Sequence, residues 1–139
     1  MILITDNAID LSKILIDVSD NSAGAITLFV GTVKDHNSRG HVSALFYEAY
    51  KKMAEDMMTE IEKEVLRKWN IIKFSATHRI GTLKVSEISV AVAVSSEHRN
   101  EAFEACKYAI DNIKTRVPIW KKEYSEAGGK WVTGVSLHE

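Results

Sequence analysis

The chain has 139 residues, of which 45% are hydrophobic and 27% charged, and its formal net charge is -1. This length and composition fit one domain, spanning residues 1–139, with a hydrophobic core of its own. The charge argues against a surface built for nucleic acid, and no apolar run approaches the roughly 20 residues that cross a bilayer.

In the first half of the chain, the sequence pattern predicts a strand, a helix and a second strand, in that order. Residues 2–4 predict a short strand, and residues 7–18 an amphipathic helix. After a turn at 20–24, the β-branched run at 25–33 predicts a largely buried strand. The polar, glycine-containing stretch 32–43 then predicts a mobile loop. That loop carries basic and titratable side chains: Lys34, His36, Arg39 and His41.

The second half predicts strands alternating with two long helices. Residues 45–50 predict a strand, and apolar residues then recur at helical spacing over 53–69. Alternating patterns at 71–77 and 88–94 predict two further strands, and residues 97–117 predict the last helix.

Each long helix carries an apolar stripe that is expected to face the core. In the first, the stripe includes Met53 and Met57, which we interpret as core side chains rather than a binding surface. In the second it includes Phe103 and Cys106, so Cys106 is expected in the core and not as a reactive thiolate. As the only cysteine, Cys106 also excludes an intrachain disulfide and a cysteine zinc site.

The last segment, 123–139, contains Gly128-Gly129 followed by Trp131, which predicts a turn and a short terminal strand. The order of elements is that of an α+β domain with helices packed on a mixed or antiparallel sheet. Because no basic leader precedes an apolar segment, we expect a cytoplasmic protein.

The densest group of cations surrounds Pro118. Pro118 cannot continue a helix, so Lys114 is expected in the last helical turn and Lys121 on the chain that follows, with both ammonium groups facing one site. The alternative is that the cations only complement the negative end of the helix dipole, worth up to about 1 kcal/mol. No acid between Asp111 and Glu123 neutralises the four cations Lys114, Arg116, Lys121 and Lys122.

Two His-Arg pairs offer further candidates. His98 and Arg99 lie where a strand turns into the last helix, and a helix N-terminus with an arginine favours phosphate or carboxylate. The alternative there is an exposed first turn in which Arg99 pairs with a nearby carboxylate. We interpret His78-Arg79 as a structural hydrogen-bonding pair. The five histidines form no cluster with metal-ligand spacing, so no metal is expected.

Four segments together resemble the large, catalytic subunit of molybdopterin synthase. They are Phe29-Val-Gly-Thr-Val-Lys-Asp-His-Asn37, His78-Arg-Ile-Gly81, Val94-Ser-Ser-Glu-His-Arg99 and Ile113-Lys-Thr-Arg-Val-Pro-Ile-Trp-Lys-Lys-Glu123. The last is the most specific, because it combines lysine, proline, tryptophan and lysine at fixed spacing. The resemblance runs from about Gly24 to Trp131 and implies an α/β-hammerhead-like fold.

The resemblance implies a sulfurtransferase that converts cyclic pyranopterin monophosphate into molybdopterin by installing two sulfurs as a dithiolene. The sulfur would arrive as a thiocarboxylate on the C-terminal Gly-Gly of a small ubiquitin-like subunit. Large subunits of this family pair, and each binds one small subunit, which implies a homodimer within a heterotetramer. No separate cofactor is implied.

Carried over position by position, the resemblance makes Lys114 and Lys121 the catalytic lysines. It places His98 and Arg99 at the substrate pocket, with Phe29 nearby. Two more basic residues complete the predicted substrate-binding set: Lys34 and Arg116. Lys34 stands where the family commonly has arginine, and an ammonium keeps the charge but loses the planar fork of a guanidinium.

Two other functions stay open at this point. A small α+β domain with a glycine-bounded loop also suggests an acylphosphatase-like phosphohydrolase, although that gives no role to the segment from Lys114 to Lys121. A non-catalytic anion-binding or RNA-binding module is the second alternative. It would need stacking aromatic residues and a broader basic surface.

Overall fold

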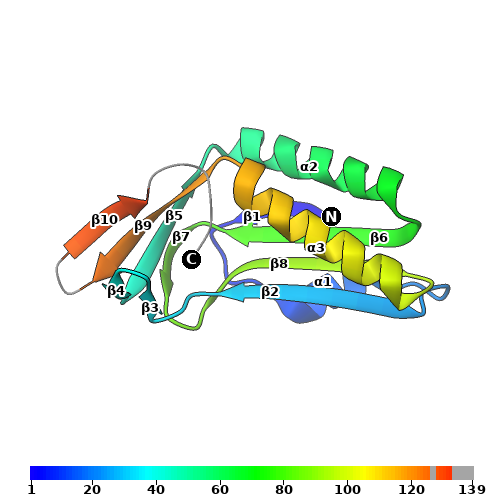
Figure 1. Ribbon diagram of the computed structural model, residues 1–139, viewed down its shortest axis with the longest axis horizontal. Coiled ribbons are helices and arrows are strands. Elements are labelled where there is room, and N and C mark those ends of the chain that lie inside the picture. Colours follow the sequence, from blue (N-terminus) through cyan, green and yellow to red (C-terminus); the bar gives the residue numbers. More distant parts are fainter. Residues whose placement is uncertain (126–127, 133–139) are drawn as a thin grey trace.

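The computed structural model describes residues 1–125 and 128–132, which form two four-stranded sheets, a two-stranded hairpin and three helices (Figure 1). The elements follow in this order: β1 (Ile2–Thr5), α1 (Leu11–Val18), β2 (Ala25–Thr32), β3 (His36–Asn37), β4 (Gly40–His41), β5 (Ala44–Ala49), α2 (Lys51–Lys68), β6 (Ile71–Arg79), β7 (Gly81–Lys84), β8 (Ile88–Ser96), α3 (Arg99–Arg116), β9 (Ile119–Ser125) and β10 (Gly128–Val132). The predicted α+β class is confirmed.

The first sheet has the strand order β1-β6-β8-β2. It is mixed, because β1 runs parallel to β6 while the other neighbours are antiparallel. Helices α2 and α3 cover one face, and α1 packs on β6 and β8 from the other (Figure 1). The main core fills the space beneath α2 and α3, and includes Ile4, Met58, Ile61, Val65, Val92, Val94 and Ile113.

The second sheet, of order β10-β9-β5-β7, is wholly antiparallel. The chain enters this sheet first at β5 and returns to it from the first sheet between β6 and β7. At that junction Gly81 has φ of +96°, a left-handed conformation that a side chain would disfavour. The glycine therefore lets one polypeptide leave one sheet and enter the next within two residues.

Helix α1 begins later than its apolar pattern predicts. Asp10 caps it, because its Oδ1 accepts hydrogen bonds from the backbone N–H groups of Ser12 (3.0 Å) and Lys13 (3.4 Å). Before the cap, the hydroxyl of Thr5 accepts the N–H of Asn7. The prediction of a helix from residue 7 was therefore wrong, since two side chains hold that segment in turns.

The apolar stripes of the long helices were predicted correctly except at two positions. Met53 is 60% exposed and Phe103 is 61% exposed, so neither belongs to the core. Cys106 does: it is buried beneath α3, and burial raises the pKa of its thiol to about 11. The core position expected for Cys106 is therefore confirmed.

The segment after β2 is more ordered than a mobile loop. His36 pairs with His41 and Asn37 with Gly40 in the β3–β4 hairpin. At the other end of the chain, Gly128 and Gly129 lie within β10, which pairs with β9. The predicted turn at these glycines was wrong, and Thr133 lies outside the described residues.

None of the helices in the described part of the chain combines the length and apolar character that spanning a membrane requires.

Candidate functional site

The buried Lys121 lies on β9 and lines a small cavity that we name the Lys121 cavity. The strand turns Ile119, Lys121 and Glu123 inward, because alternate side chains of a strand face the same side. Lys121 is only 2% exposed. The cavity has a volume of about 30 Å³ and is lined by Thr32, Lys34, His36, Asn37, Val42, Leu45, Tyr47, Lys121 and Glu123.

Two lysines line this cavity. Lys34 lies two residues after the end of β2. The residue between them, Val33, is buried in the core. No described residue forms a hydrogen bond or ion pair with the Lys34 side chain. The structure thus places Lys34 and Lys121 at one cavity, although 87 positions separate them in the sequence.

Glu123 fixes the hairpin that covers the cavity. Its Oε2 accepts a hydrogen bond from Nδ2 of Asn37 at 2.6 Å, and its Oε1 accepts one from the guanidinium of Arg39. The carboxylate is nearly buried and forms an ion pair with the arginine. The β3–β4 hairpin is therefore tied to the strand that carries Lys121.

Tyr47 supplies the wall between the Lys121 cavity and the interior. It is the cross-strand neighbour of Lys121, and its ring meets that of His78 edge-on, with centroids 5.0 Å apart. Burial raises the pKa of the Tyr47 phenol, against the opposing effect of its hydrogen bond with Ser89. Tyr47 is therefore a neutral hydroxyl at neutral pH.

Lys114 lies in the last turn of α3, which ends at Arg116, with Val117 as an extended C-cap directly before Pro118. Its side chain is half-buried, and no described residue pairs with its ammonium. Lys114 does not line the Lys121 cavity. It lies at the end of α3 beside the second sheet, where the chain continues into β9 (Figure 1).

Arg116 has a different environment from its cationic neighbours. Its two terminal nitrogens donate to the two carboxylate oxygens of Glu64 on α2, both at 2.7 Å. Nη1 also donates to Oδ1 of Asn112. The segment from Lys114 to Lys122 contains no acid, but Glu64 of α2 neutralises its Arg116. Arg116 connects α2 to α3 and is not among the residues that line the Lys121 cavity.

His98 and Arg99 lie at the opposite end of α3. With Gly24, Glu97 and Asn100 they line a polar pocket of about 390 Å³, which we name the α3 N-terminal pocket. Arg99 is exposed and, within the described chain, has no hydrogen-bonding or ionic partner. A guanidinium beside a helix N-terminus is suited to a phosphate.

Gly24 and Ser96 hold the turn that presents this pocket. A Cβ on Gly24 would lie 2.3 Å from the carbonyl oxygen of Glu97, and the N–H of Gly24 donates to the carbonyl of Ser96 at 3.0 Å. The Ser96 hydroxyl donates to the carbonyl of His98. The backbone of the pocket is therefore packed tightly against the start of β2.

The two groups of predicted site residues are far apart within one chain. Lys114 lies fifteen positions beyond Arg99 on one helix, which at 1.5 Å per residue separates them by roughly 22 Å. Figure 1 shows α3 running straight between these two ends. One chain therefore does not bring His98 and Arg99 together with Lys114 and Lys121.

Two other aromatic or basic candidates lie in the interior. Phe29 packs against the main core beneath α3 and lines neither pocket. His78 is fully buried; its Nδ1–H donates to the carbonyl of Arg79, and burial lowers its pKa to about 4. Arg79 in turn pairs with Glu87 at 3.1 Å. The structural role expected of His78-Arg79 agrees with these contacts.

Sequence reasoning missed Tyr47, Asn37 and Glu123 as lining residues of the Lys121 cavity. Glu123 had a usable signal, because it lies two positions after Lys121 and so shares its face on a strand. Asn37 had none, since its role depends on a contact with Glu123 across 86 positions. Among the described residues, no three His, Cys, Asp or Glu side chains gather as a metal site would require.

Comparison with known proteins gives one consistent family. A family model described as MoaE protein matches residues 4–116. The molybdopterin synthase catalytic subunit of Thermoplasma volcanium is 46% identical over 129 residues, 92% of this chain and 94% of that protein. Its namesake from Bacillus subtilis is 45% identical, over 93% of this chain and 82% of that protein. A crystal structure of molybdopterin synthase from Staphylococcus aureus has a TM-score of 0.89 and 40% identity, covering 94% and 95% of the two chains.

The mixed sheet, the antiparallel sheet and the basic side chains at both ends of α3 define an α+β protein with the architecture of a molybdopterin synthase structure. The chain belongs to the MoaE protein family, because the match spans most of its length. The resemblance seen in the four sequence segments is thereby confirmed.

Proposed function

We propose that this chain is the catalytic subunit of a molybdopterin synthase. It converts cyclic pyranopterin monophosphate into molybdopterin, with sulfur from the C-terminal Gly-Gly thiocarboxylate of a small ubiquitin-like subunit. The observation that carries the proposal is the buried Lys121 beside Lys34, in a chain 46% identical to a protein named molybdopterin synthase catalytic subunit. A cytoplasmic location, where the lone cysteine stays reduced, completes the proposal.

The lysines suit this chemistry because both reactants are anionic. A thiocarboxylate and a cyclic phosphate repel each other in water, and two ammonium groups can hold them together. When the sulfur attacks, negative charge develops on the tetrahedral intermediate. An ammonium such as that of Lys121, removed from water, stabilises that charge more strongly than an exposed one does.

Each basic residue has its own part in the proposal. Lys114 and Lys121 are the catalytic lysines, with Lys114 able to exchange a proton at the open end of α3. Lys34 holds the substrate at the Lys121 cavity. Arg99 binds the phosphate, and His98 beside it moves a proton. Arg116 is left out of the substrate site, because Glu64 occupies its fork.

The separation of the two groups along α3 supports a homodimer with composite sites. If two copies pair so that their α3 helices run antiparallel, the N-terminus of one helix lies opposite the C-terminus of the other. Arg99 of one copy then faces Lys114 of its partner. A substrate with a phosphate at one end and its reacting carbons at the other can bridge the two groups.

The edge strand β2 is the surface we propose for this pairing. Its outer edge has no strand neighbour in the described part of the chain. Ile26 on β2 is 43% exposed, and the exposed Phe103 lies on α3, which packs over β2. An unpaired edge flanked by exposed apolar side chains favours association with a second strand.

The proposed activity is tested with a thiocarboxylated small subunit and cyclic pyranopterin monophosphate, followed by mass spectrometry of the pterin. Wild-type protein should yield the dithiolene product. Lys114→Ala should lose at least about a hundredfold in rate, the range for removing a charged transition-state contact, with an unchanged circular dichroism spectrum. Lys63→Ala, on the exposed side of α2, is the matched control.

Wild-type turnover in Lys114→Ala would contradict the assignment of this lysine. Absence of product from wild-type protein that binds the small subunit would contradict the function itself. In that case the protein should be assayed for phosphate release from an acyl phosphate. Release would support the acylphosphatase-like alternative.

A further inference from the structure

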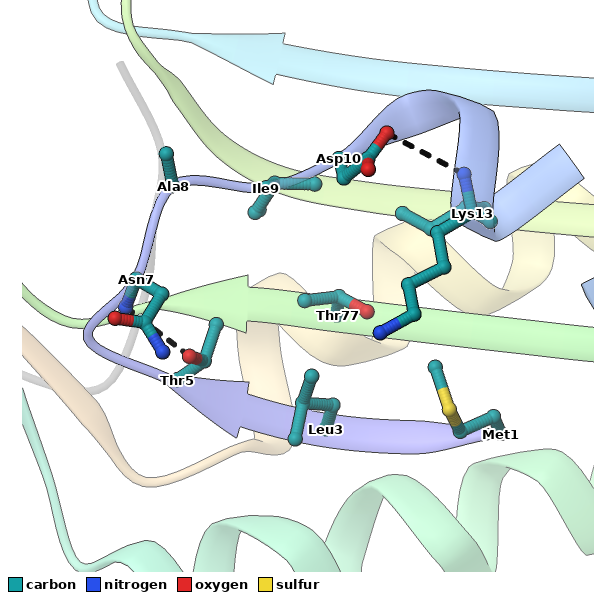
Figure 2. Close-up of a pocket in the computed structure, with 10 residues that line it drawn as sticks. Met1, Leu3, Thr5, Asn7, Ala8, Ile9, Asp10, Lys13 and Thr77 are labelled. Atoms are coloured by element: carbon teal, nitrogen blue, oxygen red, sulfur yellow. Dashed lines mark hydrogen bonds between the residues drawn. The ribbon is translucent and has the colours of Figure 1, made fainter.

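A cavity of about 200 Å³ lies on the face of the first sheet that α1 covers, away from both basic pockets. The strand β1, the segment at residues 7–10, the first turn of α1 and Thr77 of β6 surround it (Figure 2). It shares no lining residue with the Lys121 cavity or the α3 N-terminal pocket. The proposed sulfur transfer gives it no role.

One side of this cavity is apolar. Leu3 projects from β1 and Met1 directly precedes this strand, and both are partly exposed to solvent. Ile9 and the buried Ile14 contribute from the α1 side. Apolar surface that stays accessible in a concave site favours a ligand with a hydrocarbon part.

The floor carries a hydroxyl that lacks a partner. Thr77 is only 3% exposed, and its Oγ1 has no hydrogen-bonding partner within the described chain. Buried hydroxyls are nearly always paired, so an isolated one facing a cavity indicates a place for a polar ligand atom.

A free cation lies across the same cavity. Figure 2 shows the Lys13 side chain extending from α1 over Thr77, with its ammonium on the side of β1. None of the described residues pairs with that ammonium. Lys13 and Thr77 thus offer a charge and a hydroxyl to one group.

The remaining polar residues limit the charge of a ligand. Asp10 also lines the cavity, with Oδ1 held by the N–H groups of Ser12 and Lys13. Thr5 already accepts the N–H of Asn7 (Figure 2). Met1, which also lines the cavity, carries the N-terminal ammonium, which donates to the carbonyl of Phe74 at 2.6 Å. The two cations and the one aspartate leave a single net positive charge, which suits a monoanion better than a phosphate dianion.

We propose that this cavity binds a short aliphatic carboxylate. The carboxylate accepts hydrogen bonds from Nζ of Lys13 and Oγ1 of Thr77, and the hydrocarbon chain lies against Leu3, Ile9 and Ile14. The cavity is smaller than the roughly 300 Å³ at which drug-sized sites begin, so a ligand of about eight heavy atoms is the right scale. For so few atoms a Kd of the order of 1 mM is expected.

The test is a titration of the ¹⁵N-labelled full chain with 4-methylpentanoate, followed by two-dimensional NMR, beside its uncharged counterpart 4-methylpentanamide. The acid should shift amides of residues 3–13 and Thr77, and the amide should bind about tenfold more weakly. Lys13→Gln and Thr77→Val should each weaken binding of the acid by about tenfold, as loss of one charged hydrogen bond predicts.

Two matched controls separate the site from general effects. Lys63→Gln removes an exposed lysine elsewhere. Ser75→Ala removes a second buried, unpartnered hydroxyl two residues earlier on the same face of β6, outside the cavity lining. Both controls should bind the acid as wild type does.

Several results would overturn the proposal. They are equal affinity for the acid and the amide, unchanged binding in Lys13→Gln, shifts centred on Lys34 or Lys121, and no saturable shift up to about 20 mM. Because Lys13 is exposed, Lys13→Gln is decisive even if Thr77→Val fails to fold.

Discussion

At the scale of single residues, the environment of each cation separates its role from that of its neighbours. Arg116 is held in a fork by Glu64, Lys121 is buried next to Tyr47, and Lys114 stays unpaired within the described chain. These three belong to one short segment of sequence that looks uniformly basic. What distinguishes these three cations is therefore how buried each one is and which residues it contacts, and not its residue type.

Lys34 is predicted to act in substrate binding more than in turnover. It contributes one ammonium contact at the Lys121 cavity, so Lys34→Ala should raise KM by about tenfold and leave kcat within about twofold. Steady-state kinetics at saturating small subunit measures both constants. An unchanged KM would remove Lys34 from the site, and Lys63→Ala serves as the control.

Gly24 is predicted to position the turn of the α3 N-terminal pocket, at which we propose that the substrate phosphate binds. In Gly24→Ala the new methyl would overlap the carbonyl of Glu97 and push the turn that carries His98 and Arg99 outward. Overpacking of this kind costs about 1–3 kcal/mol, and KM should rise several-fold, because Lys114 and Lys121 lie far from this turn.

Ser96→Ala is the companion variant. It removes the hydrogen bond to the carbonyl of His98 and should also raise KM. Ser22→Ala, in the preceding turn, leaves the contact between Gly24 and Glu97 intact and should behave as wild type. A Gly24→Ala protein with wild-type KM would show that this turn does not position the substrate.

At the scale of elements, the pairing of α2 with α3 depends on Glu64. Its carboxylate accepts two hydrogen bonds from Arg116 and one from the hydroxyl of Tyr108. The contacts with Arg116, and then with Tyr108, lower the pKa of Glu64 from 4.5 to about 2. The helix that carries Lys114 and Arg99 is therefore held in place by a charged network.

This network predicts a pH-dependent stability. Because the pKa of Glu64 is lower in the folded state, its contribution is fully present above about pH 4.5 and is lost as pH falls toward 2. Glu64→Gln should lose about 1–3 kcal/mol of unfolding free energy at pH 7, and the difference from wild type should shrink below pH 4. Urea denaturation at both pH values measures it; a pH-independent difference would contradict the assignment.

At the scale of the whole molecule, the sequence predicted the first sheet better than the second. Alternation of apolar residues identified β8, and Pro118 placed the end of α3 within one residue of its observed end at Arg116. The sequence did not predict strand β9. Its inward positions carry Lys121 and Glu123, whereas the alternating pattern that indicates a half-buried strand needs apolar side chains there. Strand β7 has only four residues, too few for a periodic signal.

The candidate site was predicted as a set of residues but not as an arrangement. The four sequence segments supplied Lys34, Lys114, Lys121, His98 and Arg99. Their distribution over opposite ends of α3 depends on the length of that helix and the packing of two sheets, which motif spacing does not encode. The same holds for the fork between Glu64 and Arg116, whose partners lie 52 positions apart.

The central claim is that this chain transfers sulfur at sites shared between two copies. The most direct measurement mixes two inactive variants, Arg99→Ala and Lys114→Ala, under conditions that exchange protomers, and assays molybdopterin formation. In a mixed dimer one of the two sites is wild type, so random exchange predicts recovery of about a quarter of wild-type activity. Product in that range would support the account, and no recovery from demonstrably mixed dimers would contradict it.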